Sequence, residues 1–170
     1  MGIPKKQYFL RFLAAALAGF GLHSLYDRFP ILPIALLAPV QESLWEHLKL
    51  LFWPCLAAAL FLYRRGCPLR PRLFTLLLLC AIQLGVSTWY HILLGGESVA
   101  VDIALYLLLV TAAFVIPCLL RGPYTGGGWP LVLPLTLVLA CLILLFSLFP
   151  PEGVIFLDLS GANTWSRLPC

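Results

Sequence analysis

The side chains of this sequence that could bind a cation or move a proton are its seven Asp and Glu residues and its three His residues. Zinc prefers imidazole together with carboxylate, whereas the alkaline earths prefer oxygen ligands alone. Gathered near a membrane core, such groups are typical of a divalent metal site or a proton path. The candidate ligands are His23, Asp27, Glu42, Glu46, His47 and Asp102.

The first candidate pair, His23 and Asp27, is four residues apart at the end of an apolar run. On a helix that continues through both positions, the two side chains share one face and can hold a common cation. The alternative is a histidine at the membrane interface beside a carboxylate that ends a helix, because ligand sets normally need three or four groups. Both interpretations stay open.

The second candidate group lies in the stretch 41–49, at the start of the next apolar run. Ser43 and Glu46 fit the S-x-x-E capping box, in which each side chain bonds a free backbone N–H at the helix start. Capping does not explain Glu42 and His47. Because Glu42 and Glu46 share a face only if the helix begins before Ser43, the cap and the ligand interpretations of Glu46 exclude one another.

Two further polar residues, His91 and Asp102, lie at a third and a fourth helix end. Each has an ordinary explanation: Asp in the first turn suits the helix dipole, and His beside aromatic residues suits a membrane interface. Four helix ends nevertheless supply such groups to one side of the membrane, and this convergence favours a common site. Glu97, Glu152 and Asp158 are interpreted as loop residues.

An integral membrane protein is indicated by the composition, which is 62% hydrophobic and 11% charged, with a mean hydropathy of +0.99. A helix of about 20 apolar residues crosses the hydrocarbon core. Runs that are apolar on every face predict helices rather than the alternating strands of a membrane barrel. The predicted fold is an all-α bundle forming one membrane domain over 1–170, with transmembrane helices at about 8–25, 43–63, 73–94, 99–120 and 129–149.

The basic residues predict the orientation, because short cytoplasmic loops are rich in Lys and Arg. Most of them fall on one side of the threaded chain: Lys5, Lys6, Arg11, Arg64, Arg65, Arg70, Arg72 and Arg121. The N-terminus is then cytoplasmic, the C-terminus is extracytoplasmic, and the candidate ligands face outward from the cell (plasma) membrane. The net charge of +4 is such a topology signal and does not indicate nucleic acid. An alternative for the first run is a secretory signal cleaved near Ala16-Leu17-Ala18.

Two segments outside the helices bear on the outer face. Segment 30–40 is apolar, contains three prolines and is too short to cross, which predicts a re-entrant or interfacial segment. The extracytoplasmic tail, 150–170, starts with Pro-Pro and is either a lid over the candidate site or loose. The six cysteines show no close pairing, so neither a disulfide framework nor a thiolate zinc site follows.

Three stretches carry a resemblance to other sequences. They are His23-Ser24-Leu25-Tyr26-Asp27, the run APVQESLWEHLKL from Ala38 to Leu50, and Phe149-Pro150-Pro151 ahead of Phe156-Leu157-Asp158. Together they resemble a family of small bacterial multi-pass membrane proteins of unknown function, with an HxLYD segment followed by N-E-S-V-W-E-H-L-K. Gln41 stands where that pattern has Asn. The resemblance implies the same plan of helices and no particular activity.

Three functions agree with these residues. The first is to bind or conduct a divalent metal such as zinc, or protons, with an ion or small ligand held at the outer face. The second is a non-catalytic accessory or structural role beside another membrane protein or a second copy of the chain. The third is a membrane-embedded metal-dependent hydrolase with Glu46 or Glu42 as general base. No HExxH or GxSxG motif supports an enzyme, and the lipid bilayer is a partner in all three cases.

Overall fold

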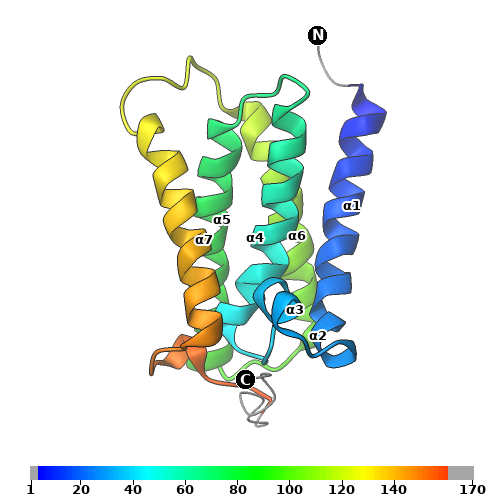
Figure 1. Cartoon of the computed structure of the whole chain (residues 1–170), viewed down its shortest axis with the longest axis vertical. Coiled ribbons are helices and arrows are strands. Elements are labelled where there is room, and N and C mark those ends of the chain that lie inside the picture. Colours follow the sequence, from blue (N-terminus) through cyan, green and yellow to red (C-terminus); the bar gives the residue numbers. More distant parts are fainter. Residues whose placement is uncertain (1–3, 161–170) are drawn as a thin grey trace.

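Helices form most of the part of the chain that the structure, a computed structural model, describes, which is residues 4–160 (Figure 1). The long helices are α1 (Lys5–His23), α4 (Leu44–Tyr63), α5 (Arg70–Ser87), α6 (Val99–Leu119) and α7 (Val132–Leu148). α5 continues as the π-helix η1 (Thr88–Leu93), and the 3-10 turn η2 (Trp129–Leu131) precedes α7. Residues 4–160 contain no strand, so the all-α prediction is confirmed. Residues 161–170, the end of the predicted tail, lie outside the described part.

Four helical segments of this part are long and apolar enough to cross a bilayer: Leu44–Tyr63, Arg70–Leu93, Val99–Leu119 and Trp129–Leu148. They match the second to fifth segments predicted from the sequence closely. α1, which carries Lys5, Lys6 and Arg11, is not among these four. The first helix lies closer to the N-terminus than the predicted segment 8–25. α1 ends at His23, because the backbone leaves helical geometry at Ser24 (φ −105°, ψ 8°).

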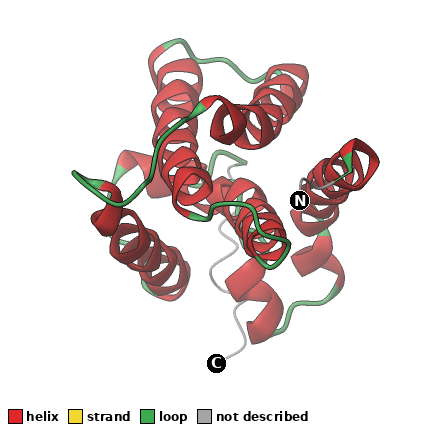
Figure 2. Cartoon of the chain, turned by 90° about the horizontal axis from the view of Figure 1, so that it is seen from above, coloured by secondary structure: helices red, strands yellow, loops and turns green. Residues whose placement is uncertain are grey.

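α4 is the central helix of the bundle. Inside the protein, 61% of its apolar window is buried, against 17–28% for the other three candidate spans. Viewed from above, α1 stands at the edge of the bundle (Figure 2), where it packs against α4 and α6. The outward surfaces of the helices carry exposed apolar side chains such as Leu108, Leu119 and Leu137, as expected for contact with lipid.

The two ends of the bundle differ in content. Loops 64–69 and 120–128 and the start of α1 lie at one end, at the top of Figure 1. At the other end lie α2 (Leu25–Arg28), α3 (Leu32–Leu37), loop 94–98 and the tail 149–160, where the 3-10 turn η3 (Val154–Phe156) forms. We call this second end the site end, because His23, Glu42, His47 and Asp102 all lie there.

Segment 29–43 packs on the bundle as a short helix with extended flanks. Ala35, Ala38 and Val40 of this segment are buried. The side chain of Lys49, on α4, donates hydrogen bonds to the backbone oxygens of Ala35 (2.6 Å) and Ala38 (3.0 Å). Non-helical backbone at the edge of a membrane needs such protein partners, because lipid offers none.

The first part of the tail is docked at the site end. The backbone N–H of Leu159 donates to Glu42 O at 3.0 Å, and Gln41 Nε2 donates to Phe156 O at 3.1 Å. The Phe156 ring lies against Trp45 at a centroid distance of 5.3 Å. Residues 149–160 therefore pack over the start of α4, so the described part of the tail is held in place.

Candidate functional site

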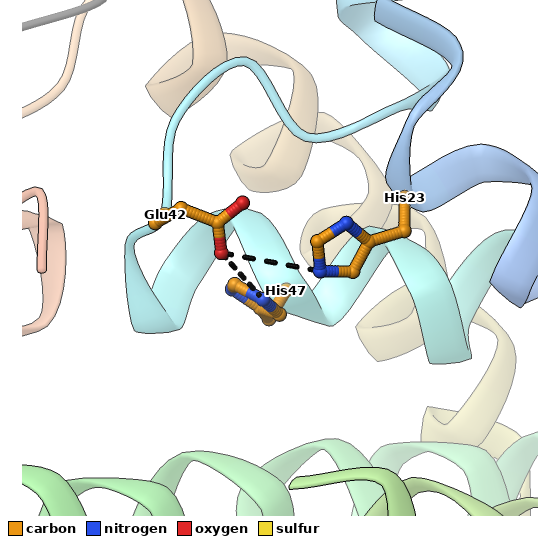
Figure 3. Close-up of side chains that lie close together, drawn as sticks. All are labelled: His23, Glu42 and His47. Atoms are coloured by element: carbon orange, nitrogen blue, oxygen red, sulfur yellow. Dashed lines mark ion pairs between the residues drawn. The ribbon is translucent and has the colours of Figure 1, made fainter. Parts of the chain in front are cut away.

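Three side chains of the site end converge on one point (Figure 3). His23 comes from the last turn of α1, Glu42 from the loop before α4, and His47 from the first turn of α4. Glu42 Oε2 lies 3.2 Å from His47 Nε2 and 3.9 Å from His23 Nε2. One ligand atom from each residue lies within 4.8 Å of the other two. We call these three residues the His-Glu-His group.

The start of α4 fixes the position of two of these residues. Ser43 is extended (φ −100°, ψ 153°), and its Oγ accepts the backbone N–H of Glu46 at 3.2 Å, which begins the helix at Leu44. Glu42, the residue before this cap, therefore lies outside the helix, and its side chain turns toward His47. Gln83 of α5 adds a hydrogen bond to His47 O at 3.1 Å.

The imidazole of His47 is oriented by a backbone carbonyl. His47 Nδ1 lies 2.8 Å from Ser43 O, and a carbonyl oxygen only accepts, so Nδ1 carries the proton. This arrangement directs Nε2 toward Glu42. In metal proteins, the same kind of contact sets the tautomer of a ligand histidine and raises its basicity. His47 is therefore prepared to bind a cation through Nε2.

The carboxyl of Glu42 is held in its charged form. The hydrogen bond from His47 lowers the pKa of Glu42 below its ordinary value, partial burial opposes this effect, and the charges of His47 and His23 add to the lowering. With Nδ1 bonded to a carbonyl and Nε2 facing a carboxylate, His47 bears two protons in this arrangement. A cation at the same place would replace the Nε2 proton, so binding would release it.

A cavity of about 580 Å³ opens beside the His-Glu-His group, between α1, α4, α5 and α6. Across it, His91 Nε2 lies 2.9 Å from Asp102 Oδ1, and His91 Nδ1 lies 2.8 Å from Gly96 O. This second pair repeats the arrangement at His47, with one ring nitrogen on a carbonyl and the other on a carboxylate. His91 belongs to the π-helix η1, a distortion that often occurs at functional sites.

The structure brings together only part of the ligand set predicted from the sequence. His23, Glu42 and His47 meet, and Asp102 lines the same cavity while paired with His91. Asp27 is exposed on α2, beyond the break at Ser24, so the shared helix face that would have joined it to His23 is interrupted.

Glu46 points into the protein, away from the His-Glu-His group. Its Oε2 accepts hydrogen bonds from Lys49 Nζ (2.7 Å) and the Val40 N–H (2.8 Å), and its Oε1 lies 3.1 Å from Ser147 Oγ. Ser43 caps α4, but these partners occupy both carboxylate oxygens, so Glu46 does not complete the reciprocal half of the capping box. This buried pair was not predicted from the sequence, although Glu46 and Lys49 have the i,i+3 spacing of helix ion pairs.

His91 and Glu97 also line the cavity, although His91 had been interpreted as a residue of the membrane interface and Glu97 as a loop residue. Their placement depends on the loop between α5 and α6, which folds His91 back onto Gly96 and Asp102. Nothing in the local spacing of these residues indicates that contact.

Comparison with known proteins yields no match for this chain among protein-family models, curated proteins or solved structures. The resemblance of residues 38–50 to a family of small membrane proteins therefore stays a prediction.

Proposed function

We propose that this chain is a multi-pass membrane protein that binds a divalent transition metal, with zinc as the best fit, through the His-Glu-His group. The observation that carries the proposal is the convergence of three ligand atoms within 4.8 Å of one another. Two imidazoles and one carboxylate are a known zinc ligand set. These groups come from three different segments of the chain, which is what a built site requires and a single capping motif does not provide.

The distances agree with metal coordination. Tetrahedral zinc with bonds of about 2.1 Å separates neighbouring ligand atoms by about 3.4 Å. Glu42 Oε2 lies 3.2 Å and 3.9 Å from the two histidine Nε2 atoms, so small side-chain rotations are enough to admit the ion. The side chains of His23 and Glu42 are 48% and 45% exposed, which gives an ion access to the site.

Three protein ligands leave one coordination position of zinc open. Structural zinc sites are closed by four protein ligands, whereas sites that bind or activate another molecule keep a position for water or ligand. The adjoining cavity gives that position space. We therefore favour a site whose metal binds a further ligand over a purely structural site that only holds the helices together.

The five-helix topology is part of this proposal. α1 has 19 residues, about 28 Å at the helical rise, and it runs beside α4 (Figure 1), so a bilayer crossed by α4 is crossed by α1 as well. Phe9 and Leu17, exposed by 59% and 61%, suit contact with lipid. The basic residues near the opposite end favour a site end outside the cell membrane, according to the positive-inside rule.

The metal proposal is tested by measuring bound metal and affinity. Detergent-purified protein is stripped with chelator, loaded with zinc, and analysed by mass spectrometry of the metal and by competition with a chromophoric chelator. We expect one zinc per chain, with affinity reduced more than about tenfold in His23→Ala, His47→Ala and Glu42→Gln. Asp27→Asn is the matched control, because it removes a nearby exposed carboxylate outside the group. Absence of stoichiometric zinc, or equal affinity in all variants, would overturn the proposal.

The topology is tested separately by labelling single cysteines in intact cells. In a cysteine-free background, a membrane-impermeant maleimide should label Glu152→Cys at the site end directly. It should label Thr125→Cys, in the loop at the opposite end, only after the membrane is permeabilised. Both positions are exposed in the bundle, so accessibility reports the membrane side. The reverse labelling pattern would place the site end in the cytoplasm.

A further inference from the structure

The cavity beside the His-Glu-His group changes character along its length. Most of its polar lining residues lie toward the site end, among them His23, Glu42, His47, His91 and Asp102, whereas Gln83 and Tyr106 line it further in. One to two helical turns further into the bundle the lining is mainly apolar: Phe20, Leu50, Leu105 and Leu109. The cavity therefore has a polar mouth that contains the proposed metal and an apolar interior.

The apolar part is deep enough for an extended chain. On α6 the whole lining runs from Val99 to Leu109, about 15 Å at 1.5 Å per residue, and its mainly apolar part beyond Asp102, from Ile103 to Leu109, spans about 9 Å. The volume of about 580 Å³ lies in the range of sites for small organic ligands. At this depth Tyr106 connects α6 to α1, because its hydroxyl donates to Ala16 O at 3.0 Å.

The interior also leaves apolar surface uncovered by the bundle. Phe20 and Ile103 line the cavity from α1 and α6, and each is 41% exposed. Covering such surface with an apolar chain is favourable. A small polar ligand would leave these walls uncovered, whereas a ligand without polar groups would desolvate the histidines and carboxylates of the mouth without bonding to them.

We infer that the cavity binds an amphiphile with one apolar chain, whose oxygen-bearing head group occupies the open position of the metal. The head is of a kind that ligates zinc, such as a carboxylate or hydroxamate, and the chain lies against Phe20, Leu50 and Leu109. The His91 and Asp102 pair faces the same mouth and offers polar contacts to the head. This inference rests on the proposed metal site.

The test uses full-length protein in lipid nanodiscs, loaded with zinc, and alkyl hydroxamates of two, eight and twelve carbons as probes. Affinity is measured by displacement of a fluorescent fatty hydroxamate, with empty nanodiscs correcting for partition into lipid. Expressed against the concentration of free probe in water, which the empty-nanodisc control supplies, affinity is expected to rise with chain length by up to about fourfold per methylene. Removal of zinc should weaken all three probes.

Two tryptophan variants on α6 form a matched pair for this test. Ile103→Trp narrows the cavity, whereas Leu108→Trp adds the same ring at a position that is 66% exposed and does not line it. Both should bind zinc like the wild type, which reports correct folding. Ile103→Trp should weaken the twelve-carbon probe more than about tenfold and leave the two-carbon probe unchanged, and Leu108→Trp should change neither.

The outcomes separate the two proposals. Retained zinc binding with an affinity independent of chain length in the wild type overturns the amphiphile inference and leaves the metal site standing. Equal effects of Ile103→Trp and Leu108→Trp likewise overturn it. If the wild type does not bind zinc, the metal site is overturned, and with it the head-group contact on which this inference depends.

Discussion

Replacing Lys49 by Met is expected to destabilise the protein strongly, because this lysine is the most completely enclosed charge at the site end. Its side chain is 0% exposed. The ammonium donates to Glu46 Oε2 at 2.7 Å, to Ala35 O at 2.6 Å and to Ala38 O at 3.0 Å, which uses all three of its protons. Met keeps the length of the side chain and removes the charge and every one of these donors.

The size of the effect follows from what remains after the substitution. Glu46 would keep its contacts with Val40 N–H and Ser147 Oγ but would lose its only counter-ion within hydrogen-bond distance in the described residues. Breaking a buried ion pair by removing one partner costs about 3–5 kcal/mol. For a chain of this size the expected decrease in melting temperature is about 6–20 °C.

Buried thiols give a direct assay for this change. Cys55 and Cys80 are 5% and 2% exposed, so in a protein whose other four cysteines are replaced by Ser, a fluorogenic maleimide reacts with them only as the bundle opens on heating. Lys6→Met, at an exposed position, is the control for loss of a lysine and should melt like the wild type. In the double variant Glu46→Gln with Lys49→Met, the melting temperature should fall by less than the sum of the decreases in the two single variants, because neither charge is then left unpaired.

A decrease of less than about 2 °C in Lys49→Met would refute this reasoning. Lys49 also holds the segment that leads into Glu42, so the same variant should bind zinc more weakly than Lys6→Met. Unchanged zinc affinity in a clearly destabilised Lys49→Met variant would mean that the α4 cap alone positions Glu42.

Two further predictions concern α1 and acid stability. Gly19→Ala should lower the melting temperature by several degrees, because the new Cβ would clash with the Tyr106 hydroxyl. Gly21→Ala is the control, because its Cβ meets no other atom, and it should not destabilise the protein. Equal melting temperatures of the two variants would contradict the close contact between α1 and Tyr106. For Glu42, the lowered pKa means that its stabilisation is present above the unfolded carboxyl value of about 4.3 and is lost as the pH falls through the lower folded value. Metal-free wild type should therefore lose more thermal stability than Glu42→Gln on acidification from about pH 6 to about pH 3, and parallel curves would contradict it.

The long helices were predictable because their apolar runs are bounded by charged residues, Gly or Pro. The predicted segment 99–120 is α6 (Val99–Leu119), and 129–149 covers η2 and α7 to Leu148. The first helix was placed less well, because the apolar pattern continues past His23 whereas the backbone turns at Ser24. Hydropathy measures which residues prefer lipid, and it does not contain the local dihedral angles that end a helix.

The composition of the candidate site was harder to predict, since it depends on contacts between distant segments. His23 meets His47 only because α1 packs beside α4. The centroids of the two imidazole rings are 5.4 Å apart. His91 meets Asp102 because loop 94–98 reverses the chain between η1 and α6. A single sequence predicts such residues at the same end of the bundle, but it does not show which helices are neighbours or which path the loops take.

The two glutamates at the start of α4 show how the fold separates a ligand from a structural charge. Because the helix begins at Leu44, after the extended Ser43, Glu42 and Glu46 do not share a helix face despite their spacing of four. Glu46 is turned inward, where Lys49 neutralises it, whereas Glu42 stays half-exposed between two histidines. An unpaired Glu46 would be a second carboxylate able to compete for a cation in this region. The buried ion pair therefore both anchors segment 29–43 and leaves Glu42 as the carboxylate that the proposed metal meets.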